Sequence, residues 1–157
     1  MSKPKEIPGL VIRPAQPEDA SVILALIREL AEYEKLASAV IATEAGLRSS
    51  LFGPRPGAEV LLTEFENQTV GYALFFPNYS TFRALPGMYL EDLFIRPAFR
   101  GRGFGKSLLL RLFALARERG YGRVEWSVLD WNQPAIDFYR ALGAEPLSDW
   151  TAYRLSL

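Results

Sequence analysis

The sequence has 157 residues, the size of one ordinary domain, and we expect a single domain over 1–157 with a flexible lead over 1–9. Its 18 basic and 18 acidic residues balance, so no overall field attracts the protein to nucleic acid or to an anionic membrane. The sequence contains neither Cys nor His, which excludes disulfides, thiolate nucleophiles, the usual zinc ligands and the usual general base. Catalysis must therefore use carboxylates, Tyr, Ser, Thr or backbone groups, and we expect no metal site.

No segment has the pattern of a targeting signal or a membrane span. The sequence starts MSKPKEIPGLVIRP, without the apolar core of a secretion signal, and apolar runs such as LLLRLFALA are short and interrupted by charge. We therefore expect a cytoplasmic protein.

The first third of the chain predicts a strand and two helices. Residues 10–15 favour a short strand, and residues 17–36 favour a helix with Pro in its first turn. The apolar stripe of this helix recurs at helical spacing and places Tyr33 and Glu34 on the same face one turn later. Residues 43–52 predict a second, weaker helix, which the GPRPG loop ends.

The middle of the chain predicts three strands and a long loop. Residues 58–65 and 69–76 are typical of two strands joined as a hairpin. Residues 77–87 are polar and contain scattered aromatic residues, so we expect a loop there. Residues 88–95 predict the next strand.

The remainder of the chain predicts a helix at 106–119, a strand at 123–130, a short helix at 132–143 and a final strand at 151–157. The order of elements is β-α-α-β-β-β-α-β-α-β, with hairpins early and a β-α-β crossover late. This order predicts an α/β fold with a mixed sheet, in which the crossover joins parallel strands. Ligands of such sheets bind beyond the carboxyl ends of the strands.

A turn with three alternating glycines lies between the strand at 88–95 and the helix that follows. Its sequence, FRGRGFGKSLL, has one residue too few for a Walker A loop and lacks the third glycine of a dinucleotide-binding motif. The backbone amides near 102–106 point to one position at the positive end of the helix, and Arg100, Arg102 and Lys106 add positive charge. The turn thus fits an anion site, although its spacing alone fits a solvated turn equally well.

The stretch RGRGFG resembles the R-x-x-G-x-G pyrophosphate loop of the GNAT superfamily of N-acetyltransferases. The resemblance extends to IRPA…IRELAEYEKL, YLEDLFIRPAFRGRGFG and VLDWNQPAIDFYRALGA, and so covers residues 12–150. These blocks together are similar to the spermidine/spermine (diamine) acetyltransferase branch, and LDWNQ is most similar to its thialysine acetyltransferase members. Three ordered blocks are far more specific than one six-residue loop.

The resemblance implies a GNAT fold, in which two parallel strands of a mixed sheet splay apart, and acetyl-CoA as the cofactor. The residues it implies for cofactor binding are Leu93, Phe94, Ile95, Arg100, Gly101, Arg102, Gly103, Phe104, Gly105, Lys106, Asn132, Gln133, Pro134 and Ala135. Asn132 is also a good helix N-cap, so capping and coenzyme contact are equal alternatives for it.

Acetyl transfer to an amine requires a base, because an alkyl ammonium group has a pKa near ~10.4. Without His, the base is a carboxylate or a water chain that ends at one. Glu91 is the best candidate, because strand alternation places it on one face with Tyr89, Leu93 and Ile95, where burial would raise its pKa. The resemblance also places this Glu beside the amine, often through water. Asp92 points to the opposite face in this pattern, where we expect a structural hydrogen-bond partner.

For Tyr139 the resemblance implies a general acid that protonates the coenzyme A thiolate, although its apolar neighbours also fit a core position. A backbone N–H near Leu93 is expected to polarise the acetyl carbonyl. The substrate contacts that the resemblance implies are Tyr33, Glu34, Glu91, Glu125, Trp126 and Ser127. Glu125 and Trp126 differ from the family pattern, which leaves a polyamine or a thialysine-like substrate open.

We therefore expect direct acetyl transfer from acetyl-CoA to a small diamine, polyamine or thialysine-like amine. The alternatives are acetylation of protein amino groups and a non-catalytic acyl-CoA-binding module. The loop expected at 77–87 favours a covered small-molecule site over an open peptide groove. The resemblance also implies a homodimer, with which exposed aromatic residues at Tyr79, Phe82 and Trp150 are compatible.

Overall fold

The computed structural model describes residues 6–157, so most of the lead predicted at 1–9 lies outside the described residues. The chain divides into two compact units, Met1–Ser127 and Val128–Leu157, whose placement relative to one another is not determined. The single domain over 1–157 stays a prediction.

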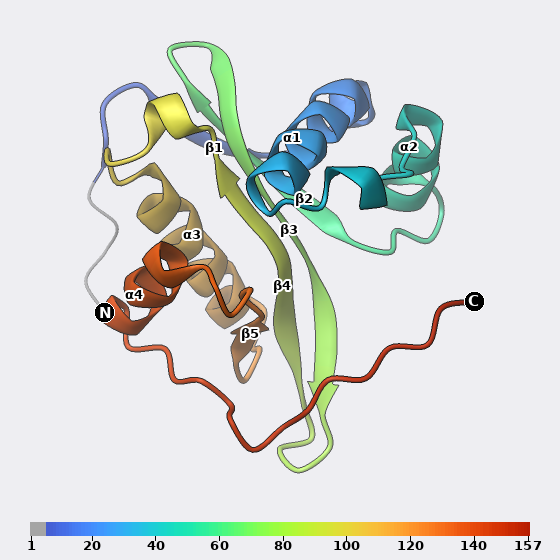
Figure 1. Cartoon of the computed structure of the whole chain (residues 1–157), viewed down its shortest axis with the longest axis vertical. Helices are drawn as coiled ribbons and strands as arrows, with labels where there is room; N and C mark the ends of the chain where they lie inside the picture. Colours follow the sequence, from blue (N-terminus) through green and yellow to red (C-terminus); the bar gives the residue numbers. More distant parts are fainter. Residues whose placement is uncertain (1–5) are drawn as a thin grey trace. The chain divides into compact units, whose positions relative to one another are not determined.

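The first unit contains a five-stranded sheet (Figure 1). Its strands lie in sequence order: β1 (Leu10–Pro14), β2 (Glu59–Phe65), β3 (Gln68–Ser80), β4 (Leu85–Ile95) and β5 (Val124–Trp126). The first four strands pair antiparallel, whereas β5 runs parallel to β4. The predicted mixed sheet with a late parallel crossover is confirmed.

Helices cover both faces of this sheet. In Figure 1, α1 (Ala20–Tyr33) and α2 (Glu44–Phe52) lie on one face and α3 (Phe104–Glu118) lies on the other. Three single turns of 3-10 helix complete the first unit: η1 (Pro17–Asp19), η2 (Ala37–Ala39) and η3 (Pro97–Phe99).

The core that fixes α1 on the sheet follows from the apolar stripe of this helix. Ile23 and Leu26 are completely buried and belong to one cluster with Tyr72 of β3 and Phe94 of β4. Burial of each large apolar side chain contributes about 1.5–3 kcal/mol. The Oγ1 of Thr43 caps α2 by accepting the N–H of Gly46 at 3.0 Å. The buried stripe therefore holds α1 against β3 and β4, and the cap defines the start of α2.

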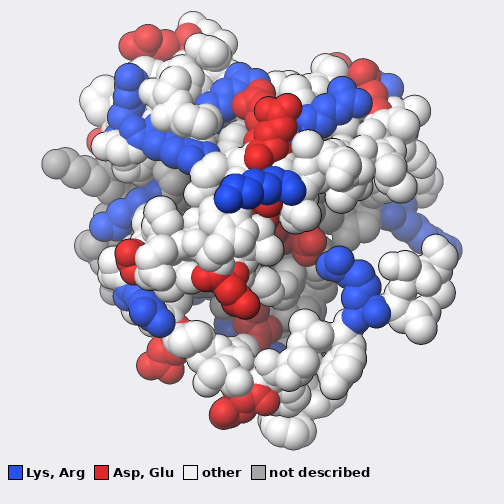
Figure 2. All heavy atoms as spheres, viewed as in Figure 1, with Lys and Arg blue, Asp and Glu red and all other residues white. Residues whose placement is uncertain are grey.

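The surface carries charges of both signs. Figure 2 shows Lys and Arg interspersed with Asp and Glu on the visible face, as the equal counts of 18 and 18 lead one to expect. Among the described residues, no helix has the length and apolar character that crossing a membrane requires.

The loop predicted at 77–87 is wrong. Strand β3 continues to Ser80, β4 begins at Leu85, and Pro77 pairs with Met88, so only 81–84 form a turn. Turn-forming residues such as Pro77 favour a loop locally, but the cross-strand pairing provides hydrogen bonds for the other residues. Residues 77–87 form a two-stranded arm in place of the expected loop. They therefore give no support for a loop that covers a small-molecule site.

The strand predicted at 151–157 is also wrong. The second unit contains α4 (Gln133–Ala141), and its last residues form neither helix nor strand. Tyr153 is 94% exposed and Leu155 is 81% exposed. A strand requires a neighbouring strand for its backbone groups, and among the described residues none pairs with this segment. The strand predicted at 123–130 is likewise shorter, since β5 ends at Trp126.

Candidate active site

A β-bulge interrupts β4 at Glu91. Leu74 of β3 pairs with Asp92 and the next residue, Phe75, pairs with Leu90, which leaves Glu91 as an extra residue. The bulge shifts the alternation of β4 by one position. Glu91 and Asp92 therefore both face α1, where strict alternation would place them on opposite faces.

The bulge corrects the expected environment of Glu91. Tyr89 and Glu91 share a face, as predicted, but Leu93 and Ile95 face α3: a Cβ added to Gly105 of α3 would lie 3.7 Å from Ile95 Cγ1. Glu91 is exposed, so the predicted burial of its carboxylate is wrong. Water has access to this carboxylate.

Asp92 is held by a buried tyrosine. The hydroxyl of Tyr72, a completely buried residue, donates a hydrogen bond to Asp92 Oδ2 at 2.9 Å. Burial raises the pKa of Asp92 to about 6; the bond from Tyr72 opposes this rise, and the charges of Glu91 and Glu34 add to it. The expected role as a structural hydrogen-bond partner is confirmed, whereas the expected opposite face is wrong.

Glu34 completes an acidic group with Glu91 and Asp92. Burial and the charge of Glu91 raise the pKa of Glu34. The charge of one carboxylate raises the pKa of another appreciably only when the two groups are near each other. We call Glu34, Glu91 and Asp92 the acidic group; it contains two of the predicted substrate residues and adds Asp92.

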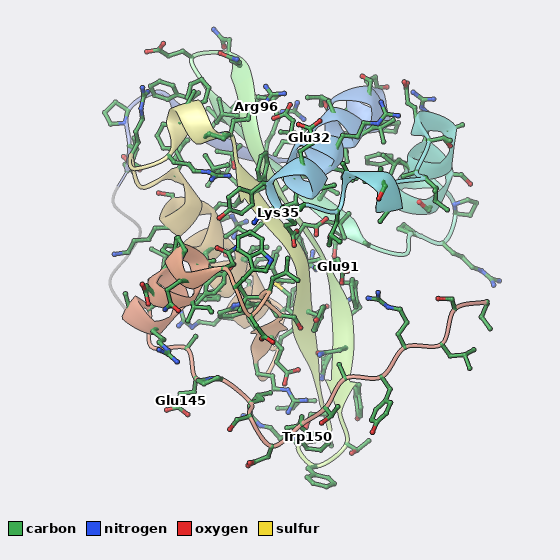
Figure 3. The ribbon with its side chains drawn as sticks, in the orientation of Figure 1. Glu32, Lys35, Glu91, Arg96, Glu145 and Trp150 are labelled. Carbon is green, nitrogen blue, oxygen red and sulfur yellow. The ribbon has the colours of Figure 1, made fainter. Side chains whose placement is uncertain are left out.

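The C-terminal end of α1 presents Glu34 to this group. The helix ends at Tyr33, and Glu34 is its C-cap. Lys35 then adopts a left-handed φ of 61°, and the N–H of Leu36 donates to the carbonyl of Ala31 at 2.8 Å, the pattern of a Schellman motif. Figure 3 labels Lys35 just after α1 and Glu91 on β4. The backbone at this end of the helix is thus fixed.

The glycine turn forms an anion-binding geometry. Helix α3 begins at Phe104, two residues earlier than predicted, because Gly103 serves as its N-cap with a φ of 82°. No side chain caps the helix, and no acidic residue lies in its first turn. Gly101 has a φ of 75° and open space around its Cβ position, and Arg102 and Lys106 are exposed. Unpaired amides, positive charge and free space suit a diphosphate.

Arg100 reaches from this turn back to α1 and β4. Its Nε donates to the carbonyl of Ile95 at 2.8 Å. Its guanidinium carbon lies 4.6 Å from the ring centroid of Tyr33 and 5.4 Å from that of Phe94. The turn and the end of α1 are therefore in direct contact, which the sequence did not predict.

β4 and β5 separate beyond a short paired region. They pair only as far as Leu90 and Trp126, so the edge of β4 beyond this point has no strand partner within residues 6–157. The N–H of Arg96 donates to the carbonyl of Val70 on β3 at 2.8 Å. By alternation, the N–H of Leu93 points to the opposite, open edge. The predicted splayed strands are confirmed, and the N–H of Leu93 is available to a ligand at this edge.

The carboxylate of Glu125, on β5, has two partners. Its Oε2 accepts a hydrogen bond from Asn78 Nδ2 at 2.9 Å and forms an ion pair with Arg123 at 3.2 Å. Asn78 belongs to the arm formed by β3 and β4, which the sequence predicted as a loop. The arm therefore positions a predicted substrate residue.

The two residues after Glu125 face different ways. Ser127 Oγ lies 2.8 Å from the hydroxyl of Tyr89, on the face of the acidic group. The ring of Trp126 stacks with Phe113 of α3 at 6.2 Å. The structure thus brings Ser127 toward the acidic group and does not bring Trp126 there.

The remaining predicted site residues belong to the second unit. Asn132 Oδ1 accepts the N–H of Ala135 at 3.4 Å and caps α4, whose first turn contains Pro134. The capping interpretation of Asn132 is confirmed. Tyr139 is partly buried, with its ring 5.4 Å from that of Phe138. Coenzyme contact by Asn132 and acid catalysis by Tyr139 stay predictions.

Comparison with known proteins agrees with this geometry. The chain is 40% identical to the thialysine N-epsilon-acetyltransferase of Bos taurus, across 92% of this chain and 91% of that one. It is 36% identical to the L-ornithine N5-acetyltransferase of Arabidopsis thaliana, across 92% and 83%. An aminoglycoside acetyltransferase from a soil metagenome has the same fold, with a TM-score of 0.79, 22% identity and coverage of 94% and 97%.

A family model also matches most of the chain. The model of the "Acetyltransferase (GNAT) family" matches residues 25–144, a span that contains the acidic group, the splayed strands, the glycine turn and α4. With these matches, the chain belongs to the GNAT family of acetyltransferases.

Proposed function

We propose that this protein transfers the acetyl group of acetyl-CoA directly to a primary amine of a small diamine, polyamine or thialysine-like amino acid. The observation that carries the proposal is the acidic group: the bulge places Glu91 and Asp92 on one face, toward Glu34 at the end of α1. Carboxylates attract a cationic amine most strongly where they are partly buried. Both named relatives, by their names, acetylate the side-chain amine of an amino acid.

The glycine turn fits the coenzyme. When bound, acetyl-CoA supplies a thioester acetyl group. The amides at the start of α3, together with Arg102 and Lys106, would hold its diphosphate. The N–H of Leu93 at the open edge of β4 would donate a hydrogen bond to the acetyl carbonyl and stabilise negative charge on its oxygen. The segment 132–135 would contact the same coenzyme.

Two side chains would handle the protons. An alkyl ammonium group with a pKa near ~10.4 must lose a proton before it attacks. Glu91 would accept this proton directly or through water, and its exposure suits the route through water. The phenol of Tyr139 would donate a proton to the departing thiolate.

We further propose a cytoplasmic homodimer. Support comes from large exposed side chains: Tyr79 is 61% exposed, Phe82 is 102% exposed and Trp150 is 80% exposed. Contact with a second copy would remove such apolar surface from water. Sedimentation tests this, and a monomer at micromolar concentration contradicts it.

The substrate class is tested by a coupled thiol-release assay. The panel contains thialysine, L-ornithine, spermidine and a lysine-containing peptide. We expect release of coenzyme A with the small amines and little with the peptide. Release with the peptide alone would identify a protein acetyltransferase, and coenzyme binding without release would identify a binding module.

The proton carriers are tested by pH–rate profiles of Glu91→Gln and Tyr139→Phe. Glu91→Gln should lower kcat/KM at neutral pH by about 10²-fold and recover toward pH ~10, where the amine is already neutral. Tyr139→Phe should lower kcat by about 10²-fold without such recovery, because an acid is missing. Glu32→Gln, which removes an exposed carboxylate from the last turn of α1, is the matched control. Equal losses at every pH would contradict a role in proton transfer for either residue.

A further inference from the structure

We infer that Arg100 is a positioning residue for the amine: it fixes the ring of Tyr33 and thereby the end of α1 that carries Glu34, so the coenzyme turn and the amine site share one side chain. The inference rests on the proposed function, because it concerns the amine bound by the same acidic group. Neither the glycine pattern nor the charge of Arg100 predicts this contact.

Nearby groups contact both the backbone and the side chain of Arg100. Its backbone N–H donates to the carbonyl of Pro97 at 3.2 Å, which closes η3, and its Nε donates to the carbonyl of Ile95 at 2.8 Å. The planar group then lies near two rings, 4.6 Å from the centroid of Tyr33 and 5.4 Å from that of Phe94. Phe94 is only 3% exposed and belongs to the core. Arg100 thus joins Tyr33 to a fixed part of the sheet.

The packing of Tyr33, the last residue of α1, bears directly on the position of Glu34. Lys35 has a φ of 61°, a left-handed conformation that costs a residue with a side chain roughly 1–2 kcal/mol. Glu34 is the C-cap immediately before it, so its carboxylate moves with the last turn of the helix. A loss of packing at Tyr33 would free this turn and displace Glu34 from the acidic group.

A second arginine ties the same helix to the same segment. Arg96, labelled in Figure 3, binds both carboxylate oxygens of Glu29 through Nε at 2.9 Å and Nη2 at 2.8 Å, and its Nη1 donates to the carbonyl of Thr69 at 2.7 Å. Arg96 holds α1 at Glu29, one turn before Tyr33. Arg100 therefore controls only the last turn, which is the part next to the acidic group.

Because Arg100 lies in the coenzyme turn and contacts Tyr33, binding of the coenzyme and binding of the amine should affect each other. An anion bound at the turn restricts Arg100, and a restricted Arg100 restricts Tyr33 and Glu34. Coenzyme A should therefore tighten amine binding, and by linkage the amine should tighten coenzyme binding by the same factor.

The direction of the change in amine affinity shows whether Arg100 acts by positioning Tyr33 or through its charge. A positive charge beside the amine site repels a cationic amine, so its removal would by itself tighten amine binding. If Arg100 instead acts by positioning Tyr33, its replacement should weaken amine binding. Lysine in place of Arg100 keeps the charge but lacks the planar face that stacks on Tyr33 and the Nε that binds Ile95, so Arg100→Lys isolates the positioning effect.

The experiment measures thialysine binding by calorimetry, with and without coenzyme A, for the wild type and Arg100→Lys. Without coenzyme A, we expect Arg100→Lys to bind thialysine about fivefold more weakly, the loss of a cation–π contact worth roughly 1 kcal/mol. Coenzyme A should tighten thialysine binding in the wild type and not in the variant. The matched control is Arg111→Lys, whose Nη1 lies 3.3 Å from Glu118 Oε1 within α3, outside the acidic group and the glycine turn. Its thialysine affinity without coenzyme A should stay within about twofold of the wild type.

A second variant keeps the test decisive if Arg100→Lys unfolds. Tyr33→Leu removes the ring that Arg100 contacts and should bind thialysine about fivefold more weakly. The double variant Arg100→Lys/Tyr33→Leu should lose no more than either single variant, because both remove one contact.

Unchanged or tighter thialysine binding in both Arg100→Lys and Tyr33→Leu overturns the inference, as do fully additive losses in the double variant. These failures differ from failure of the proposed function. If the wild type neither binds thialysine nor releases thiol with any amine, both proposals fall; if the wild type is active, only the role of Arg100 falls.

Discussion

Replacement of Asp92 by Asn is expected to stabilise the protein, and only above the pH at which the carboxyl ionises. Asp92 is half-buried, accepts the Tyr72 hydroxyl at 2.9 Å and lies within the influence of Glu91 and Glu34. An asparagine has the same shape and its Oδ1 accepts the same hydrogen bond, but it carries no charge. The substitution therefore removes the unfavourable ionisation and keeps the contact.

The magnitude follows from the pKa. In the folded protein the pKa of Asp92 is raised from 3.8 to about 6, so the folded state binds the proton more tightly than the unfolded state. The stability of the wild type then falls as the pH rises from about 4 to about 6 and stays lower above that range. At 1.36 kcal/mol per pKa unit, the upper limit is about 3 kcal/mol, and partial exposure reduces the expected gain of Asp92→Asn to about 1–3 kcal/mol at pH 8.

Urea unfolding of both proteins at pH 8 and at pH 4 measures this difference. At pH 8 the variant should be the more stable, with a free energy of unfolding higher by about 1–3 kcal/mol. Near pH 4 the two proteins should have nearly equal free energies of unfolding, because the carboxyl of the folded wild type is then neutral. Asp149→Asn, at an exposed position of the second unit, controls for the loss of one negative charge. A variant less stable than the wild type at pH 8, or equally stabilised at both pH values, would refute this account of Asp92.

Two further predictions concern residues with positive φ. Gly103→Val should abolish acetyl-CoA binding while the far-UV spectrum persists, because a β-branched residue at a φ of 82° is strained and would shift the backbone amides at the start of α3; unchanged affinity in calorimetry would mean that the turn binds no anion. Asn67→Gly should raise the free energy of unfolding by about 0.5 kcal/mol, because Glu66 and Asn67 have φ values of 51° and 64° in a two-residue hairpin that favours Gly at its second position. A lower urea midpoint for Asn67→Gly would contradict this reading of the turn.

Local patterns were enough to predict most elements of the fold. Helix α1 follows from an apolar stripe at helical spacing, which buries Ile23 and Leu26. The glycine turn was also predictable, because left-handed φ angles such as the 82° of Gly103 and a helix start both have strong residue preferences. Even the cap by Asn132 follows from residue type and spacing.

The carboxylates that make the site were only partly predictable. Sequence alternation gave Glu91 the correct face and Asp92 the wrong one, because the bulge is a property of the register between β3 and β4 and not of β4 alone. The arm at Asn78 was missed for the same reason: residues that favour a turn locally become a strand when another strand pairs with them. A pattern within one segment contains no information on such pairing.

By itself, the sequence determined which residue types are available: carboxylates without His or Cys, a basic glycine turn, and helices with one apolar face. Only the tertiary structure decided which of these side chains meet. It placed Asp92 beside Glu91 through the bulge and brought Arg100 to Tyr33. It also left the alternating residues at the C-terminal end without a strand to pair with. Each of these outcomes depends on contacts between residues far apart in the chain, which hydrogen bonding and packing select only after the elements assemble.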